Sequence, residues 1–311
     1  MTTYKIIANP AAGSGAGERA LPRIEQLLRE AGLDHSIVHT ERVGQAIELA
    51  REAALAGHDV VVALGGDGTV NEVVNGLLQA AEAGRPVPLG VLCGGRGNDF
   101  AASVGIPYDL EEGCQTLLRD QRRSIDIGRV SGGLYPQGRY FANCVGMGFD
   151  AIATIEVKKL PRLGGFLSFL IAVLKTIFLY NKAPLATIEY DGHTLRQRSL
   201  LVSIMNGRRL GGGFIMAPES QPDDGLFDLC IARQVSRGRV LTLLPHFLRG
   251  TQAGQKEITS GQARRISITA EDGPLPAQCD GEIISVEGRR LEVELLPQRL
   301  EVIYRPSGGF P

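Results

Sequence analysis

The chain has 311 residues, which is enough for about two domains with a hydrophobic core each. Its 33 basic and 34 acidic residues leave a formal net charge of -1, which excludes bulk electrostatic attraction to nucleic acid or to an anionic membrane. The five scattered cysteines exclude a disulfide scaffold, and together with an N-terminus that has no secretory signal they predict a cytoplasmic protein.

Apolar runs and helical patterns alternate through the first part of the chain. Short runs rich in β-branched residues predict strands at residues 4–8, 36–40, 59–64 and 88–92. Between them, apolar residues recur at helical spacing and predict helices over about 21–32, 44–56 and 70–78. This alternation predicts an α/β N-terminal domain with an open, mostly parallel sheet and helices on both faces.

The third predicted strand ends in a glycine-rich turn, Gly65–Thr69, that leads into a helix. Glycines let the backbone approach a ligand closely, and the free N–H groups at the helix start attract phosphate. Asp67 would repel a phosphate unless a divalent cation lies between them, and Thr69 is placed to cap the helix. The turn therefore predicts a nucleotide site. The alternative is a tight strand–helix connection, capped by Asp67, that binds no ligand.

Two further loops, 9–15 and 94–99, are also rich in glycine, and each follows a predicted strand. The carboxyl ends of parallel strands lie at one edge of a sheet, and ligands bind outside that edge. We therefore expect both loops to share one crevice with the Gly65–Thr69 turn, which supports a nucleotide site more strongly than any one loop does.

The pattern changes near residue 122, after which short alternating runs separated by turns predominate. They predict strands at 124–130, 139–145, 186–190, 200–205, 226–232, 265–270, 283–286 and 291–295. One more strand, 299–304, is compatible with either domain. Period-two alternation of this kind predicts a mainly antiparallel second domain, a β-sandwich or a barrel.

An almost wholly apolar segment, Leu163–Tyr180, lies between the early and late strands of this domain. It is shorter than the ~20 residues that a membrane span requires, and it contains Lys175. One interpretation is a buried helix packed between the domains. The other is a helix that lines a lipid pocket or lies on a membrane surface.

Several motifs occur together in one order along the chain. They are the Gly65–Thr69 turn, the stretch 95–101 (GRGNDFA), Asn206-Gly207-Arg208, the glycines at 211–213, Pro218, Asp223–Leu226 and Asp280-Gly281-Glu282. In this combination the chain resembles the diacylglycerol kinase-like lipid kinases, the superfamily that includes sphingosine and ceramide kinases. The soluble bacterial branch is the most similar.

The resemblance implies a division into two domains. The first, residues 1–125 with 298–311 returning to it, would be the ATP-binding catalytic domain, with a fold similar to NAD kinases and phosphofructokinases. The second, residues 126–297, would be a β-sandwich-like domain that binds the lipid substrate and a metal. In this family the active site lies between the two domains.

The resemblance also implies residue roles. Thr40, Asn98 and the residue at position 96 would contact ATP, and Asp67 would belong to a magnesium and water network. The phosphates would be cradled by Gly66, Asp67, Gly68, Thr69, Val70, Asn71 and Glu72. The carboxylate of Asp224 and the main-chain carbonyls of Gln221 and Leu226 would bind a structural Mg²⁺, and Glu282 would be the general base.

One position departs from the family pattern. Arg96 stands where the family usually has a threonine whose hydroxyl helps to bind ATP. A guanidinium group can pair bidentately with a phosphate, so Arg96 can substitute for that contact. The change is also compatible with an altered nucleotide preference or a reduced activity.

These features together predict an ATP- and Mg²⁺-dependent lipid kinase of phospholipid metabolism, which transfers the γ-phosphate to a hydroxyl of diacylglycerol or a related lipid. Its partner would be lipid at the inner face of the membrane, not nucleic acid, and a homodimer is compatible with the sequence. One alternative is a kinase of a soluble acceptor such as NAD, against which the Asp280–Glu282 motif and the apolar 163–180 segment argue. The other is a non-catalytic lipid- or nucleotide-binding protein, against which the retention of Asp67 and Glu282 argues.

Overall fold

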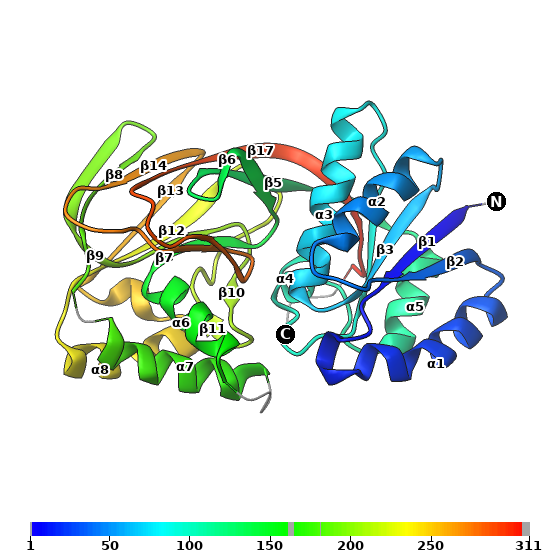
Figure 1. The fold of residues 1–311 in the computed structure, drawn as a ribbon, viewed down its shortest axis with the longest axis horizontal. Coiled ribbons are helices and arrows are strands. Elements are labelled where there is room, and N and C mark those ends of the chain that lie inside the picture. Colours follow the sequence, from blue (N-terminus) through cyan, green and yellow to red (C-terminus); the bar gives the residue numbers. More distant parts are fainter. Residues whose placement is uncertain (1, 161–164, 181, 307–311) are drawn as a thin grey trace. The chain divides into compact units, whose positions relative to one another are not determined.

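The computed structural model describes residues 2–160, 165–180 and 182–306, and the chain forms two compact units (Figure 1). Unit 1 comprises Met1–Asp126 and Pro297–Pro311, and unit 2 comprises Ile127–Leu296. The chain passes from one unit to the other within two strands, β5 (Arg122–Gly132) and β17 (Arg290–Ile303).

Unit 1 contains the parallel sheet that the sequence predicts. Its strand order is β2-β1-β3-β4-β17, and every pair in it is parallel. All six residues of β3 are buried, as expected for a central strand covered on both faces. The last part of β17 joins the sheet beside β4, where Val302 pairs with Leu89. The strands are β1 (Thr3–Ala8), β2 (Asp34–His39), β3 (Val60–Gly65) and β4 (Leu89–Cys93).

Helices cover both faces of this sheet (Figure 1). A Cβ atom on Gly76 of α3 would lie 2.3 Å from the carbonyl oxygen of Ile47, so α2 and α3 pack closely only because that position is glycine. The short helix α4 and helix α5 were not predicted from the sequence. The helices are α1 (Ala16–Glu30), α2 (Gln45–Leu55), α3 (Asp67–Glu82), α4 (Asp99–Val104) and α5 (Leu110–Arg119).

Unit 2 is built from two mainly antiparallel sheets that share the long strand β9 (His193–Met205), which confirms the predicted sandwich-like domain. The first sheet has the order β16-β15-β7-β9-β12-β13, and the second continues as β9-β8-β14-β17-β5-β6. The remaining strands are β6 (Tyr135–Phe141), β7 (Cys144–Gly148), β8 (Leu185–Tyr190), β12 (Phe227–Arg233), β13 (Ile258–Ala263), β14 (Arg265–Ala270), β15 (Ala277–Cys279) and β16 (Glu282–Ser285), with the short pair β10 (Arg209–Leu210) and β11 (Phe214–Ile215).

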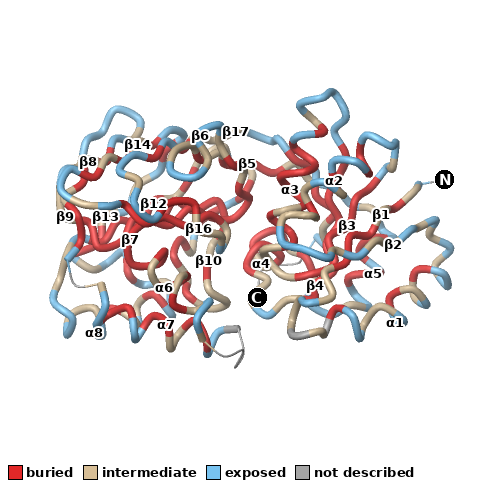
Figure 2. Tube along the Cα trace, viewed as in Figure 1, coloured by how far each residue is buried: buried red, intermediate tan, exposed pale blue. Residues whose placement is uncertain are grey.

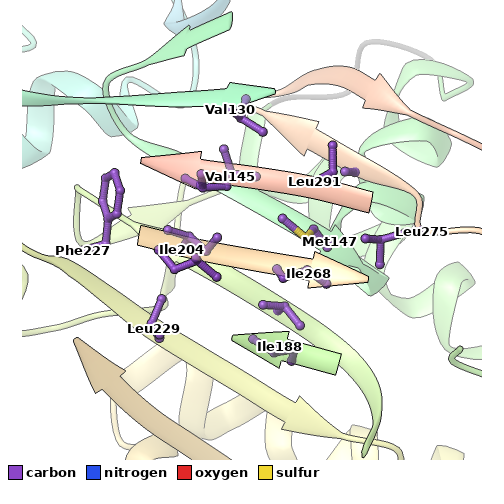
Figure 3. Packing of buried hydrophobic residues seen from close by; sticks show 14 of the residues in the cluster. Val130, Val145, Met147, Ile188, Ile204, Phe227, Leu229, Ile268, Leu275 and Leu291 are labelled. Atoms are coloured by element: carbon purple, nitrogen blue, oxygen red, sulfur yellow. The ribbon is translucent and has the colours of Figure 1, made fainter. Parts of the chain in front are cut away.

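The period-two alternation of the first sheet places its side chains in two cores. On β9, Val202 and Ile204 face the core between the two sheets, shown in Figure 3. The neighbouring Leu201 and Met205 belong to a second core, which the same sheet forms with three helices. Burial of both faces explains why β7 and β12 are almost continuously buried (Figure 2). The helices are α6 (Phe149–Lys158), α7 (Gly165–Leu179) and α8 (Arg237–Arg249).

The structure corrects the predicted strand 139–145, which is the end of β6 followed by β7. The break falls at Ala142 and Asn143, whose backbone N–H groups donate to a side chain, the carboxylate of Asp280, and not to a neighbouring strand. Helices α6 and α8 were also missed, although α8 carries Leu243 and Phe247 at helical spacing.

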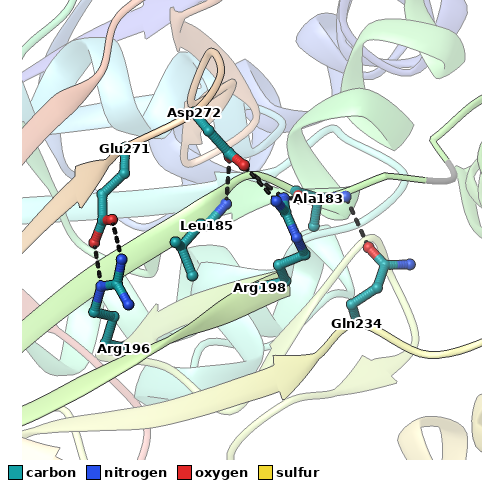
Figure 4. A network of polar contacts seen from close by, with 7 residues as sticks. All are labelled: Ala183, Leu185, Arg196, Arg198, Gln234, Glu271 and Asp272. Carbon is teal, nitrogen blue, oxygen red and sulfur yellow. Dashed lines mark hydrogen bonds and ion pairs between the residues drawn. The ribbon is translucent and has the colours of Figure 1, made fainter.

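Side chains anchor the segment that connects α7 to β8 (Figure 4). The backbone N–H of Ala183 donates to the side chain of Gln234 at 2.7 Å, and that of Leu185 donates to Asp272 at 2.7 Å. Arg198 pairs with the same Asp272. These bonds fix residues 183–185 to the ends of β12 and β14 and to β9.

Candidate functional site

The predicted convergence of glycine-rich loops in unit 1 is confirmed. The backbone N–H of Gly94, after β4, donates to the carbonyl of Gly65, the last residue of β3, at 2.9 Å. A Cβ atom on Gly95 would lie only 2.3 Å from the Cα of Gly66. The two loops therefore pack backbone against backbone, which side chains at these positions would prevent.

The loop after β1 joins the same group through Asn9. Its side-chain amide donates to the hydroxyl of Thr69 at 3.0 Å, and its oxygen accepts from the N–H of Ala11 at 3.0 Å. The expectation that Thr69 caps the helix is therefore wrong: α3 begins after Gly66, which offers no side-chain cap. A 16-residue helix thus starts at these loops without a capping side chain, as anion binding requires.

Asp67 is the first residue of α3, and its carboxylate accepts a hydrogen bond from the backbone N–H of Phe100 at 3.1 Å. Burial raises the pKa of Asp67 above its usual range, while backbone N–H groups of residues 98–100 oppose the shift. A divalent cation beside the carboxylate would remove the cost of burying its charge. The position is therefore chemically suited to the magnesium network that the resemblance implies.

Glu72 has a structural contact that the sequence did not indicate. Its carboxylate accepts from the backbone N–H groups of Gly44 at 2.9 Å and Ala46 at 3.1 Å, at the start of α2. Glu72, a residue of α3, therefore caps the N-terminus of α2, whose own N-cap residue is glycine and has no side chain to do so. Its predicted part in holding phosphates stays a prediction.

The other predicted nucleotide residues of unit 1 lie at the same edge of the sheet. Thr40 follows β2, and its N–H donates to the carbonyl of Ala8 at 2.9 Å. Arg96 is exposed in the loop after β4. Asn98 has a φ of 52°, a left-handed conformation that asparagine tolerates better than most residues. Val70 and Asn71 are buried in the first turns of α3, and the N–H of Val70 donates to the carbonyl of Gly66 at 3.1 Å, so their predicted contact with phosphate stays a prediction.

Glu282, the predicted base, is the first residue of β16 in unit 2. The preceding Asp280 and Gly281 have φ values of 45° and 85°, and Cys279 pairs with Glu282 across the turn. This is the two-residue hairpin that an Asp-Gly pair favours. The carboxylate of Glu282 is partly exposed and pairs with the ammonium of Lys158 at 2.9 Å.

The carboxylate of Asp280 fixes this hairpin to the start of β7. It accepts from three consecutive backbone N–H groups, those of Ala142, Asn143 and Cys144, at 2.9, 3.1 and 2.8 Å. Hydrogen bonds from N–H groups to a carboxylate are stronger than neutral ones, so the turn has a defined position. The first residue of the Asp-Gly-Glu motif is therefore structural.

The predicted metal turn, 221–226, is closed by its own aspartate. The carboxylate of Asp224 accepts from the N–H of Leu226 at 3.0 Å. Nearby, burial raises the pKa of Asp228, and the charges of Asp224 and Glu219 add to the effect. A cation at the turn would relieve this repulsion, and carboxylate and carbonyl oxygens are the ligands that Mg²⁺ prefers. Among the described residues, no three acidic, histidine or cysteine side chains group as metal ligands, and the predicted site requires only one.

Helix α7 corresponds to the apolar segment 163–180, of which residues 163 and 164 lie outside the described part of the chain. One face, which includes Phe169 and Val173, is buried in the core of unit 2. The opposite face exposes large apolar side chains, with Leu167 at 53% and Leu174 at 40% exposure. No helix within the described residues has the length and hydropathy needed to cross a membrane.

A cavity of about 70 Å³ lies in the core beneath α6, α7 and α8. Its lining includes Phe169, Val173 and Phe247, and within the described residues Asp150 is its only polar side chain. Such a cavity suits a hydrocarbon group and not a nucleotide.

Asp150 lies at the start of α6 and is 5% exposed. Burial raises its pKa to about 7, although a hydrogen bond from Gln278 to its Oδ2, at 3.4 Å, opposes the shift. Sequence reasoning did not single out Asp150, Gln278, Asn9 or Lys158. A lone carboxylate within the apolar run 144–155 was the available signal for the first of them.

Comparison with protein families gives two matches that together cover most of the chain. Residues 3–130 match the diacylglycerol kinase catalytic domain. Residues 143–304 match the YegS C-terminal NAD kinase beta sandwich-like domain.

Individual proteins are also similar over most of their length. A diacylglycerol kinase of Bacillus subtilis is 33% identical over 284 residues, covering 91% of this chain and 90% of that protein. One of Staphylococcus aureus is 31% identical over 282 residues, covering 89% and 85%. A solved diacylglycerol kinase structure from Bacillus anthracis has a TM-score of 0.73 at 25% identity, covering 98% and 97%. Yeast NADH kinase, at 12% identity and a TM-score of 0.55 over 98% and 84%, shares the fold.

The raised pKa of Asp150 predicts a pH dependence of stability. Because the folded protein keeps this proton up to about pH 7 while the unfolded chain loses it near 3.8, stability falls as the pH rises through that window. Asp150→Asn replaces the carboxyl group by an amide, which does not titrate in this pH range. We expect the Tm of the variant minus that of the wild type to increase between pH 5 and pH 8, measured by thermal denaturation. A constant difference would contradict the assignment.

Proposed function

Because this chain belongs to the diacylglycerol kinase family, we propose that it is a lipid kinase, which uses ATP and Mg²⁺ to phosphorylate a hydroxyl of diacylglycerol or a related lipid. The observation that carries the choice of acceptor is the apolar face of α7, where Leu167 and Leu174 are 53% and 40% exposed. The cavity in the core beneath this helix, of about 70 Å³, is apolar but admits only a small hydrocarbon group. A dinucleotide acceptor such as NAD is charged and would gain nothing from these apolar surfaces, whereas the hydrocarbon part of a lipid would.

The glycine loops of unit 1 support the ATP part of the proposal. Phosphoryl transfer depends on positioning and on neutralising charge, and backbone N–H groups supply both without long side chains. The uncapped start of α3 and the close packing of Gly66 on Gly95 leave the backbone accessible to phosphate. Mg²⁺ bound near Asp67 would neutralise phosphate charge when ATP is present.

Glu282 is our candidate for the general base. A carboxylate can take the proton of the attacking lipid hydroxyl if it lies within hydrogen-bond reach. The clamped hairpin gives it a defined position, and its partner Lys158 is exposed enough to move when a substrate enters. In unit 2, Gln221, Asp224 and Leu226 would hold a structural Mg²⁺ at their turn.

We also propose that the protein binds the membrane surface through α7. The exposed Leu167, Leu174 and Phe178 would insert among lipid chains, and Lys182 would meet anionic headgroups. Lys175 is paired instead with the buried carboxylate of Glu156, at 2.5 Å. This placement would give the kinase direct access to a lipid that does not leave the bilayer.

Replacement of Glu282 by glutamine tests the catalytic proposal, because glutamine keeps the size of the side chain and removes the base. With diacylglycerol in detergent micelles, we expect turnover to fall on the order of 10²–10⁴-fold and the KM for ATP to stay nearly constant. Glu287→Gln, an exposed carboxylate five residues further on, is the control and should behave as the wild type. Normal turnover of the Glu282 variant would exclude it as the base.

Replacement of Asp224 by alanine tests the structural metal. A ligand that binds only the folded state stabilises it, by about 2.7 kcal/mol when present at 100 times its Kd. We expect added Mg²⁺ to raise the Tm of the wild type and of the neighbouring control Asp223→Ala more than that of Asp224→Ala. Equal shifts in all three proteins would rule out this site.

The membrane proposal is tested by Leu167→Ser combined with Leu174→Ser. Each large side chain buried in lipid contributes roughly 1.5–3 kcal/mol, so the apparent KM for diacylglycerol in anionic vesicles should rise, while the Tm and the KM for ATP stay constant. Leu118→Ser, at a leucine of α5 that is 43% exposed, is the matched control. A destabilised double variant with unchanged vesicle kinetics per folded molecule would show that these positions serve the core.

A further inference from the structure

The hairpin that carries Glu282 needs support beyond its own backbone. Asp280 has a left-handed φ of 45°, which costs free energy for any residue other than glycine. Its carboxylate secures one side of the turn, at Ala142–Cys144. The backbone N–H of Gly281, at the tip of the turn, donates to a second side chain.

That side chain is Gln278 of β15, which is 1% exposed. Its Oε1 accepts from the N–H of Gly281 at 2.8 Å. Because a backbone N–H can only donate, the oxygen of the amide must face Gly281 and the nitrogen must face the opposite way. The orientation of the buried amide is therefore fixed by chemistry.

The nitrogen of Gln278 then needs an acceptor in the core, and Asp150 supplies it. Its Oδ2 lies 3.4 Å from Nε2, and the sulfur of Cys144, at 3.7 Å, is a weaker acceptor. Gly146 makes room for the carboxylate, since a Cβ atom there would lie 1.5 Å from Oδ2. A continuous polar connection thus runs from Asp150 through Gln278 to the turn before Glu282.

We propose that Gln278 is a positioning residue for Glu282 and that Asp150 fixes the orientation of the Gln278 amide. This inference rests on the proposed role of Glu282 as base. Gln278 would act through the turn and not by contact with nucleotide or acceptor, by holding the Glu282 carboxylate where it can reach the hydroxyl. A displacement of about 1 Å at a reacting group can lower a rate on the order of 10²-fold, so loss of this support should act on kcat.

The test compares two buried glutamines of unit 2. Gln278→Met removes the amide at the hairpin, and Gln252→Met removes an equally buried amide that donates to the carbonyls of Ile215 and Met216. Both variants should lose thermal stability. We expect kcat for diacylglycerol phosphorylation to fall on the order of 10–100-fold in the first only, with the KM for ATP constant in both.

Hydrogen exchange of residues 279–285 gives a readout that is independent of activity. Its rate should rise in Gln278→Met and not in Gln252→Met. Equal exchange and equal kcat in the two variants would overturn the inference, even if Glu282→Gln is inactive and the proposed function stands. If the wild type transfers no phosphate to lipid, the proposed function fails, and the exchange comparison alone decides whether Gln278 holds the turn.

Asp150 is tested by a conservative pair. Asp150→Asn keeps an acceptor oxygen for the Gln278 nitrogen and should retain kcat within about threefold, whereas Asp150→Leu removes the acceptor and should resemble Gln278→Met. Equal kcat for the two would overturn the role of Asp150. Gln278→Asn, whose shorter side chain cannot span Gly281 and Asp150, replaces Gln278→Met if that variant does not fold.

Discussion

The carboxylate of Asp280 receives three consecutive backbone N–H groups, and much of unit 2 depends on this contact. It ends β6 and starts β7 at Ala142–Cys144, where continued strand pairing would otherwise be expected. From there β7 runs through the middle of the first sheet and leads directly into α6. The same carboxylate belongs to the turn that presents Glu282, so the sheet, the helix layer and the candidate base share one anchor.

The candidate site of unit 1 is built differently. Glycines occupy the loop positions where a ligand would bind, so no side chain fills that space. Gly65, Gly66, Gly94 and Gly95 bring two loops into backbone contact. Asn9 connects the third loop to Thr69, and Asp67 is held by the backbone near Phe100. The start of α3 at this edge of the sheet has no capping side chain, and its backbone N–H groups suit phosphate better than they suit an uncharged ligand.

The sequence was sufficient for the fold class of each unit, because the alternation of strands and helices and the period-two runs are local signals, but α4, α5, α6 and α8 were not predicted. It also placed Glu282 after an Asp-Gly turn, which the hairpin confirms. It could not show that 139–145 is interrupted, since the cause is a carboxylate about 140 residues away. The contact between the buried residues Asp150 and Gln278 was not predicted for the same reason, because a contact between distant residues leaves no periodic pattern in the sequence. Thr69 was misread as a cap because its partner, Asn9, lies far away in the sequence, in the loop after β1.

Unit 1 has an edge that is suited to phosphate, and unit 2 has a clamped carboxylate and an exposed apolar helix face. These features support the proposal that phosphate is transferred to a lipid. The most direct measurement is incubation of the protein with γ-labelled ATP, Mg²⁺ and a total lipid extract, followed by separation and identification of the labelled product. We predict label in a lipid phosphate monoester, with on the order of 10²–10⁴-fold less formed by Glu282→Gln. Label that appears only on a water-soluble acceptor such as NAD would contradict the account.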